Sequence, residues 1–136
     1  NSKIINKLLK KKSKEIKIPI LKNWKKIWKI RNKDPLIDGE TLFINKKGNL
    51  KSIGNKISDL KKIEYQYMGL IFIPKEKREK VLSLYKLISR NKKMHATGFL
   101  NFLVKKKNLI KTVVVDKGWY EFDDFEDLIN YKKNYY

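Results

Sequence analysis

Five acidic residues stand in one seven-residue window of a strongly basic chain: Glu121, Asp123, Asp124, Glu126 and Asp127. The 136 residues hold 14 acids against 34 lysines and arginines, which gives a formal net charge of +20. On an alternating strand, residues two apart share a face, so Glu121 and Asp123 would project together. Neighbouring carboxylates repel unless a cation lies between them, and hard oxygen ligands suit Mg²⁺. The pattern therefore predicts a magnesium site at Glu121 and Asp123.

The same acids have a second interpretation, as the start of a helix. Acidic side chains are favourable at a helix N-terminus, and Asp124 is the predicted N-cap of a helix over residues 125–133, with Asp127 three residues on. Capping does not explain Glu121 and Asp123, because both precede this helix. The sequence thus indicates a capped helix after a carboxylate pair, which is either a metal site or an ordinary solvated surface pair.

Composition excludes several kinds of chemistry. The absence of cysteine excludes disulfides and thiolate metal sites and is typical of a reducing cytoplasm, the predicted location. His95 is the only histidine, which excludes a multi-histidine metal site and most histidine relays. We expect no membrane span, since no run of 18 apolar residues occurs, and no signal peptide, since Lys3, Lys7 and Lys10 interrupt the start. Neither a P-loop nor a G-x-G-x-x-G motif is present.

The positive charge makes a basic nucleic-acid-binding module the alternative function. Residues 22–31 interleave lysines with Trp24 and Trp28, as binders of single strands do. However, arginine, which base and phosphate recognition favours, supplies only three of the 34 basic residues, and the lysines are spread along the chain. We therefore predict no nucleic-acid partner. A third alternative is an oligomerisation domain, for example a homodimer, that pairs through the edge of a hairpin at residues 41–53.

Helices and strands are predicted to alternate, with one inserted hairpin. Pro19 places the first strand at an edge or an end of the sheet, and Gly69 marks a bulge or a close backbone approach. Thr97 is the predicted cap of its helix. The predicted fold class is α/β, a mixed sheet with helices packed on it. The predicted helices are residues 2–12, 24–31, 75–89, 98–106 and 125–133, and the predicted strands are 15–21, 41–45, 49–53, 63–74 and 109–115. A short alternating strand that contains Glu121 and Asp123 is predicted after the turn at Gly118.

One predicted helix carries aromatic residues and a cation on the same face. Trp24 and Trp28 are one turn apart, and Arg31 lies a further turn along. This spacing indicates either a core stripe with a surface arginine or an aromatic wall and a cation that line a pocket. Asp38 and Glu40, in the turn-rich segment before the hairpin, would hold Arg31, orient a substrate, or be ordinary loop acids.

These features together resemble the bacterial nucleoside-triphosphate transferases that make activated sugars and activated small phosphates. The closest resemblance is to the cytidylyltransferase branch, which includes the choline-phosphate and phosphoglutamine cytidylyltransferases. No single stretch is as specific as a P-loop, so the order and spacing carry the resemblance, which covers nearly the whole chain. The matching stretches are Trp24-x-x-x-Trp28-x-x-Arg31, Pro35-Leu36-Ile37-Asp38-Gly39-Glu40, residues 48–54, Gln66-Tyr67-Met68-Gly69-Leu70, residues 97–100 and Gly118-Trp119-Tyr120-Glu121-Phe122-Asp123.

The resemblance implies the C-terminal part of a Rossmann-like nucleotidyltransferase, with residues 1–136 as its acceptor- and metal-binding half. The family's glycine-rich nucleotide loop and a first metal-binding aspartate would precede Asn1, so we expect this chain alone to be inactive. The implied reaction is a Mg²⁺-dependent transfer of CMP from CTP to a phosphorylated small acceptor such as phosphoglutamine, with release of pyrophosphate. The implied purpose is the modification of a capsule or cell-surface polysaccharide.

The resemblance also implies roles for single residues. Asp123, helped by Glu121, would contribute the second carboxylate to the Mg²⁺ site. His95 stands where related sequences often carry an acid. The acceptor stays open between phosphoglutamine, phosphocholine and sugar 1-phosphates, and the nucleobase is unassigned. The implied acceptor-side residues are Trp24, Trp28, Arg31, Glu40, Gln66, Tyr67 and Thr97.

Overall fold

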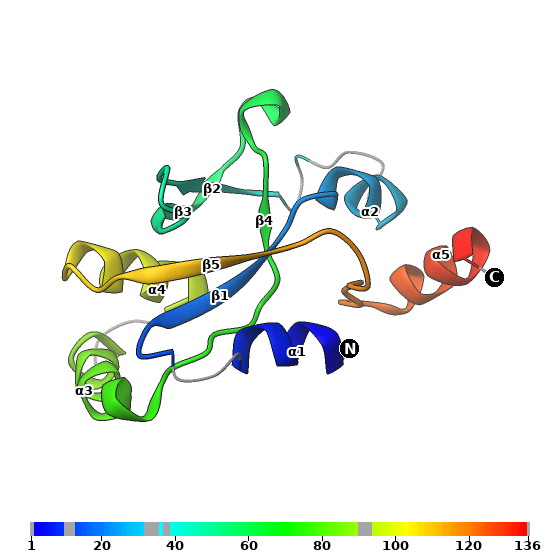
Figure 1. Cartoon of the computed structure of the whole chain (residues 1–136). Coiled ribbons are helices and arrows are strands. Elements are labelled where there is room, and N and C mark those ends of the chain that lie inside the picture. Colours follow the sequence, from blue (N-terminus) through cyan, green and yellow to red (C-terminus); the bar gives the residue numbers. More distant parts are fainter. Residues whose placement is uncertain (1, 10–12, 32–35, 37–38, 90–93, 136) are drawn as a thin grey trace.

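The computed structural model describes residues 2–9, 13–31, 36, 39–89 and 94–135 and has the alternating order that the sequence predicts (Figure 1). The fold class is confirmed as α/β, with a mixed sheet and an inserted hairpin. No helix in these ranges is long and apolar enough to cross a membrane. The elements are α1 (Ser2–Leu9), β1 (Ile16–Leu21), α2 (Trp24–Arg31), β2 (Glu40–Ile44), β3 (Leu50–Lys56), β4 (Gln66–Tyr67), α3 (Arg78–Ser89), α4 (Ala96–Lys105), β5 (Ile110–Val115) and α5 (Phe125–Tyr135), with 3-10 turns at Leu60–Lys62 and Lys75–Lys77.

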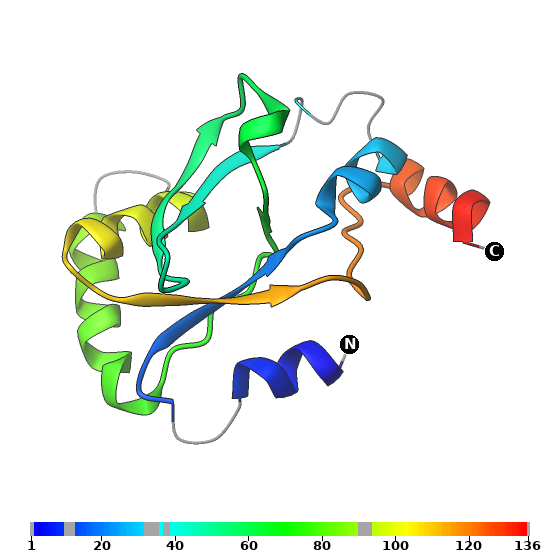
Figure 2. The same ribbon diagram turned by 45° about the horizontal axis from the view of Figure 1, so that its top comes forward.

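The main sheet has the strand order β4-β1-β5. Strands β1 and β5 run parallel, in register from Ile16 opposite Ile110 to Leu21 opposite Val115, and β4 pairs antiparallel on the other side of β1. The pairing of β1 with β5 continues through the backbone N–H of Lys22, which donates to the carbonyl of Val115 at 2.9 Å. Because these strands are parallel, the loops after both leave the sheet at the same edge, toward α2 and α5 (Figure 2).

Pro19 was expected to place β1 at an edge or an end of the sheet, and this prediction is wrong because β1 is the central strand. The nitrogen of Pro19 faces the β4 side of the strand. The Pro19 carbonyl accepts a hydrogen bond from the backbone N–H of Met68 on that side, and Lys17, which has the same orientation, pairs with Phe72. Between these two points the partner chain is not a regular strand. The missing donor of Pro19 therefore falls at a gap in the ladder, which is why a central strand tolerates it.

The long strand predicted over residues 63–74 is also wrong in its extent. Only Gln66–Tyr67 forms a strand, with an isolated bridge at Phe72. Gly69 interrupts the run with a φ of +73°, and a Cβ added there would meet nothing within 4 Å. Glycine is therefore favoured here by the positive φ and not by a close contact with another part of the chain. The break leaves Gln66, Tyr67 and Gly69 around a pocket instead of in a continuous ladder.

Buried side chains form one cluster on each face of β1, all six residues of which are buried. Ile16, Ile18 and Ile20 face the hairpin and α4, whereas Leu21 packs with the tryptophans of α2. The α1 helix adds Ile4 to the second cluster, and the Lys17 ammonium donates to the Leu8 carbonyl at its end. The second cluster fixes α2, the helix that carries three of the seven predicted acceptor-side residues.

Two helices differ in detail from the sequence prediction. The α4 helix starts at Ala96, so His95 holds the N-cap position without a side-chain hydrogen bond, and Thr97 is not the cap. On α3, apolar side chains recur with helical spacing between residues 81 and 88, but only Val81 is buried, and Leu82 and Leu87 are exposed. The α3 helix therefore has the helical spacing of apolar residues, but no described element covers most of its apolar face.

Thr97 instead packs on a glycine of β3, which gives a testable contrast. At Gly54 the φ is +91° and an added Cβ would lie 2.9 Å from both Cβ and Oγ1 of Thr97. Gly54→Ala is expected to lower the free energy of unfolding by about 2–4 kcal/mol, from left-handed strain plus overpacking. Gly69→Ala has a similar φ but open space, so it should cost only about 1–2 kcal/mol. Urea unfolding of both variants measures the difference, and equal losses would contradict the Thr97 contact.

Candidate functional site

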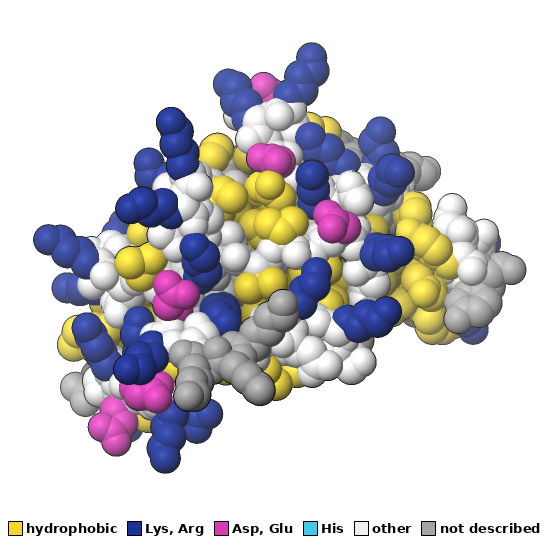
Figure 3. All heavy atoms as spheres, in the orientation of Figure 1, with side chains coloured by type: hydrophobic (Ala, Val, Ile, Leu, Met, Phe, Trp, Pro, Cys, Tyr) yellow, Lys and Arg dark blue, Asp and Glu magenta, His cyan; other side chains and the backbone are white. Residues whose placement is uncertain are grey.

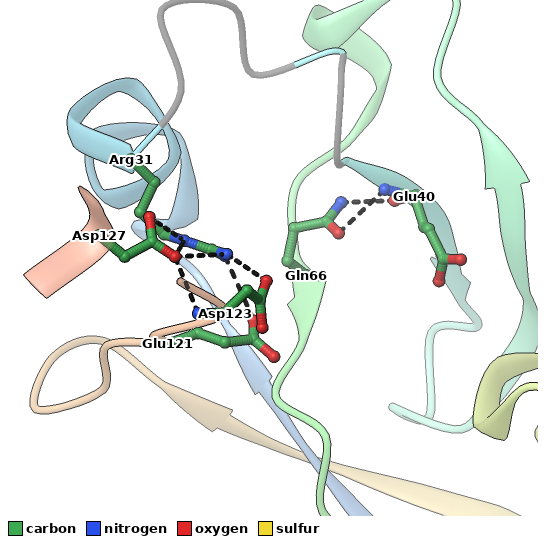
Figure 4. A network of polar contacts seen from close by, with 6 residues as sticks. All are labelled: Arg31, Glu40, Gln66, Glu121, Asp123 and Asp127. Carbon is green, nitrogen blue, oxygen red and sulfur yellow. Dashed lines mark hydrogen bonds and ion pairs between the residues drawn. The ribbon is translucent and has the colours of Figure 1, made fainter. Parts of the chain in front are cut away.

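The carboxylate pair singled out in the sequence lies around the guanidinium of Arg31 (Figure 4). Nη1 of Arg31 lies 3.4 Å from Oε2 of Glu121, and Nη2 pairs with Oδ2 of Asp123. A third carboxylate, that of Asp127, accepts from Nε of Arg31 at 3.2 Å and lies 3.1 Å from Nη2. The cation that the spacing of Glu121 and Asp123 called for is therefore supplied, in this structure, by a side chain of α2.

Burial divides the three acids into an inner and an outer set. Arg31 and Asp127 form the inner pair, with side chains only 3% and 8% exposed, whereas those of Glu121 and Asp123 are 38% and 61% exposed. A guanidinium and a carboxylate out of water require good hydrogen-bond geometry to offset their desolvation. Asp127 has such hydrogen bonds, from Arg31 and from the backbone N–H of Asp123, which donates to Oδ2 of Asp127 at 2.9 Å. The inner pair thus holds the segment that presents the outer acids.

The pKa values follow from this arrangement. Burial alone would raise the pKa of Asp127, but the hydrogen bonds from Arg31 and from the Asp123 backbone outweigh it and lower that pKa. Burial likewise opposes the charge of Arg31, yet its bonds to Asp127 and Asp123 raise its pKa. Both groups are therefore ionised near neutral pH. The cluster combines one guanidinium with three carboxylates, so carboxylate groups outnumber the cation, and the two outer carboxylates face solvent.

The segment before α5 is not the short strand that the sequence predicted, although its side chains alternate as expected. Glu121 and Asp123 both point to Arg31, while Tyr120 and Phe122 turn the other way, with ring centroids 4.9 Å apart. Both rings also contact Tyr131 of α5. The predicted cap is confirmed, since Oδ1 of Asp124 accepts from the backbone N–H of Asp127 at 2.9 Å. Aromatic packing on α5 and a helix cap thus replace sheet pairing in holding the acids.

A pocket of about 230 Å³ opens beside the outer acids and gathers most of the predicted site residues. In it, Gln66 is held by Glu40 of β2: the backbone N–H of Glu40 donates to Oε1 of Gln66 at 3.1 Å, and Nε2 of Gln66 donates to the Glu40 carbonyl. In Figure 4 the Glu40 side chain extends away from Arg31. Of the predicted site residues, the structure brings Trp28, Glu40, Gln66, Tyr67, Glu121 and Asp123 to this pocket, together with Gly69.

Two of the lining residues carry buried donors that lack partners. The indole N–H of Trp28 and the hydroxyl of Tyr67 have no hydrogen-bond partner within the described part of the chain. Burial raises the pKa of Tyr67, so its hydroxyl stays protonated and remains a donor. Unpaired buried polar groups are costly and need a reason. A ligand in the pocket that accepts hydrogen bonds from these two donors would explain why they are unpaired.

Three predicted residues lie elsewhere. Arg31 is behind the outer acids and not in the pocket lining, with its guanidinium 5.3 Å from the Trp28 ring. Trp24 is fully buried in the second core cluster, its ring 5.8 Å from that of Trp28, and Thr97 is on α4 against Gly54. The core interpretation therefore holds for Trp24. Asp38, the other suggested partner of Arg31, lies outside the described residues.

Asp127 is the residue that sequence reasoning did not place in the site. It was expected only to charge the first helical turn, yet it is buried and is the main partner of Arg31. The sequence offered one signal, because Arg31 ends an aromatic helical face and such a buried cation needs an acid. Which acid it meets depends on the packing of α2 against α5, a contact between residues 96 positions apart.

The segment proposed for single-stranded nucleic acid does not present its aromatic residues. Trp24, Trp28 and Arg31 are all buried, and the exposed side chains of α2 are those of Lys26 and Lys29. In Figure 3, lysine and arginine side chains are spread over the visible face instead of forming one stripe. Bases stack on exposed aromatic rings. The buried tryptophans of this segment therefore do not support binding of single-stranded nucleic acid.

The Arg31–Asp127 pair predicts a pH dependence of stability. Because the folded-state pKa of Asp127 lies below its ordinary value of 3.8, its contribution is fully present above that value and is lost as pH falls through the folded-state pKa. Asp127→Asn should be less stable than the parent chain at pH 7 and should lose less further stability between pH 4 and 2. Urea unfolding across this range measures it, with exposed Glu126→Gln as control. Parallel pH curves for parent and Asp127→Asn would contradict the ion pair.

Comparison with known proteins finds similar proteins among curated sequences and among solved structures. No family model matches the chain. It is 33% identical over 132 residues to the CTP:phosphoglutamine cytidylyltransferase of Campylobacter jejuni subsp. jejuni serotype O:2, a match that covers 91% of this chain and 51% of that protein. The solved structure of the inositol-1-phosphate CTP transferase from T. maritima matches with a TM-score of 0.64 at 21% identity, over 89% of this chain and 45% of that one.

These matches confirm the resemblance to cytidylyltransferases that was drawn from the sequence. The structural match supports a nucleotidyltransferase type of fold, of which this chain corresponds to a part. The chain spans about half the length of the curated relative that it matches.

Proposed function

We propose that this chain forms the acceptor side of a CTP-dependent cytidylyltransferase. In the proposed reaction, a phosphate oxygen of a small phosphorylated acceptor attacks the α-phosphorus of CTP. A new P–O bond forms, the bond between the α-phosphorus and the bridging oxygen breaks, and pyrophosphate leaves. The acceptor phosphate is itself the nucleophile, so the site needs no nucleophilic side chain. Positioning and electrostatic stabilisation would carry the catalysis.

The observation that carries this proposal is the pocket beside Arg31. The pocket is lined by the carboxylates of Glu121 and Asp123, the amide of Gln66, and residues with two unpaired donors, Trp28 and Tyr67. A polar, charged small molecule requires such a mixture of groups. Gln66 is held rigidly by the Glu40 backbone. The relative matched over 91% of this chain is named for CTP and phosphoglutamine. An acceptor of that kind carries an ammonium group, which can pair with the carboxylates, and phosphate oxygens, which accept hydrogen bonds from the donors.

The donor set also suits Mg²⁺. Glu121 and Asp123 offer hard carboxylate oxygens, and the side chain of Asp123 is 61% exposed, so it has coordination sites left beyond its bond to Arg31. We propose Asp123, assisted by Glu121, as the protein ligands in this chain. When bound, the ion would neutralise charge on the phosphate oxygens. Arg31 and Asp127 would fix the backbone that carries the ligands, so that two acids stay close before the ion arrives.

Tyr67 provides a test of the acceptor assignment. Tyr67→Phe removes a buried hydroxyl that has no partner among the described residues, so stability should be unchanged or slightly higher. If the hydroxyl donates to the acceptor, its loss should weaken acceptor binding about tenfold, as for one hydrogen bond to a charged group. Isothermal titration with phosphoglutamine, phosphocholine and a sugar 1-phosphate measures this and ranks the acceptors.

Tyr85→Phe is the matched control, because Tyr85 lies on the exposed face of α3 and outside this pocket. It should leave both stability and acceptor binding unchanged. Equal affinity of the parent chain and Tyr67→Phe for every acceptor would remove Tyr67 from the site. Use of the product to modify a capsule or cell-surface polysaccharide stays a prediction from the resemblance.

A further inference from the structure

A second and larger pocket, of about 600 Å³, shares no lining residue with the pocket of the proposed function. It opens at the edge where the parallel strands β1 and β5 end, between the loop that follows each strand. Nδ2 of Asn23, after β1, donates to the Asp116 carbonyl, after β5, at 3.2 Å and ties these loops together. The carboxyl ends of parallel strands are the usual place for ligands in open α/β sheets, and the volume is that of a small-molecule site.

Aromatic rings form one wall of this pocket. Tyr131 and Tyr135, one turn apart on α5, stack with centroids 4.9 Å apart and an interplanar angle of 29°. Tyr120 packs edge-on against Tyr131 at 4.7 Å and fixes its ring. The lining also includes Trp119 and Ile27. Rigid stacked tyrosines with partly exposed faces offer a platform for a planar ring, because ring faces are attractive stacking partners at little entropic cost.

Charged groups meet at the same pocket from two segments. Lys26 of α2 and Lys117, after β5, are exposed lining residues, and the described residues contain no ion pair to either ammonium. Asp116 adds one carboxylate, which can accept hydrogen bonds from sugar hydroxyls. The two lysines disfavour a cationic ligand such as a quaternary ammonium, although aromatic rings alone would suit one. The combination favours an anion that carries a ring.

We propose that this pocket binds a nucleoside monophosphate, at a site separate from that of the proposed function. The base stacks on the exposed ring of Tyr135, which Tyr131 supports from its other face. The ribose hydroxyls donate to Asp116, and the phosphate lies between Lys26 and Lys117. Each part of such a ligand meets a group that lines the pocket. The inference does not rest on the proposed cytidylyltransferase activity, because none of these residues belongs to that site.

Calorimetric titration of the 136-residue chain with AMP and CMP tests the proposal. Adenosine, ribose 5-phosphate and phosphocholine serve as comparison ligands, since each lacks one required part or adds a cation. We expect either nucleotide to bind at least tenfold more tightly than each comparison ligand. We also expect the affinity to fall as salt rises, because the phosphate contacts are with exposed lysines. No binding of either nucleotide at millimolar concentration would overturn the proposal, as would tighter binding of phosphocholine or ribose 5-phosphate.

Variants locate the site. Tyr135→Ala and Lys117→Ala, both at exposed side chains, should each weaken AMP binding at least fivefold without changing the circular dichroism spectrum. Lys133→Ala, on the same helix but outside the pocket lining, should bind AMP like the parent chain. Asp123→Asn should also leave AMP binding unchanged, since it alters only the other pocket. Nucleotide binding that is lost in Asp123→Asn but kept in Tyr135→Ala would place the nucleotide in the other pocket and overturn this proposal.

Discussion

Replacing Arg31 by alanine is expected to lower the free energy of unfolding by about 3–5 kcal/mol, because removing one partner of a buried ion pair leaves the other charge unpaired. Asp127 would be that charge, since its side chain is 8% exposed and receives two bonds from Arg31. The loss should be among the largest of any polar substitution in the chain. Guanidinium chloride unfolding at pH 7 measures it.

Two further variants make this test specific. Arg78→Ala removes an exposed arginine from the start of α3 and should change stability by less than about 0.5 kcal/mol. The double variant Arg31→Met with Asp127→Leu removes both inner charges and should recover much of the stability lost in Arg31→Ala, since a buried pair can be replaced by apolar side chains. A double variant as unstable as the single one would mean that packing around Trp28, and not charge pairing, causes the loss.

Replacing Asp123 by alanine is expected to have the largest effect on activity. In the proposed cytidylyltransferase reaction, kcat/KM for CTP-dependent transfer should fall at least about a hundredfold, as expected when a metal ligand is removed. Stability should change by less than about 1 kcal/mol, because the side chain is 61% exposed and its pair with Arg31 is partly solvated. Steady-state kinetics over a range of Mg²⁺ concentrations measures the effect.

Glu126→Gln supplies the control, since it removes a nearby exposed acid that belongs to neither pocket. Its kinetics should match those of the parent protein. If Asp123→Ala kept full activity with an unchanged Mg²⁺ requirement, the outer carboxylates would not be metal ligands. The pair would then serve only as surface partners of Arg31.

Much of the site was visible in the sequence because it depends on local spacing. Glu121 and Asp123 two positions apart, and Trp28 and Arg31 on one helical face, keep those relations in the structure even though residues 119–123 form no strand. Side chains alternate along any extended backbone. The resemblance added Gln66 and Tyr67, which the pocket also contains.

The features that the sequence did not reveal depend on contacts between distant segments. Asp127 looked like one more acid in a first helical turn, and only the packing of α5 on α2 shows that it is buried against Arg31. Pro19 indicated an edge strand because a ladder gap opposite a central strand cannot be read from the proline itself. The apolar run at residues 63–74 had the composition of a strand, but Gly69 turned it away from the sheet.

Pyrophosphate release from CTP tests the proposed cytidylyltransferase activity most directly. The assay would supply Mg²⁺ and compare phosphoglutamine, phosphocholine and a sugar 1-phosphate as acceptors. We predict release that requires CTP, a divalent ion and one of these acceptors, and that Tyr67→Phe slows with that acceptor. Release of no pyrophosphate with any phosphorylated acceptor, from protein that is folded and binds CTP, would contradict the assignment as a cytidylyltransferase.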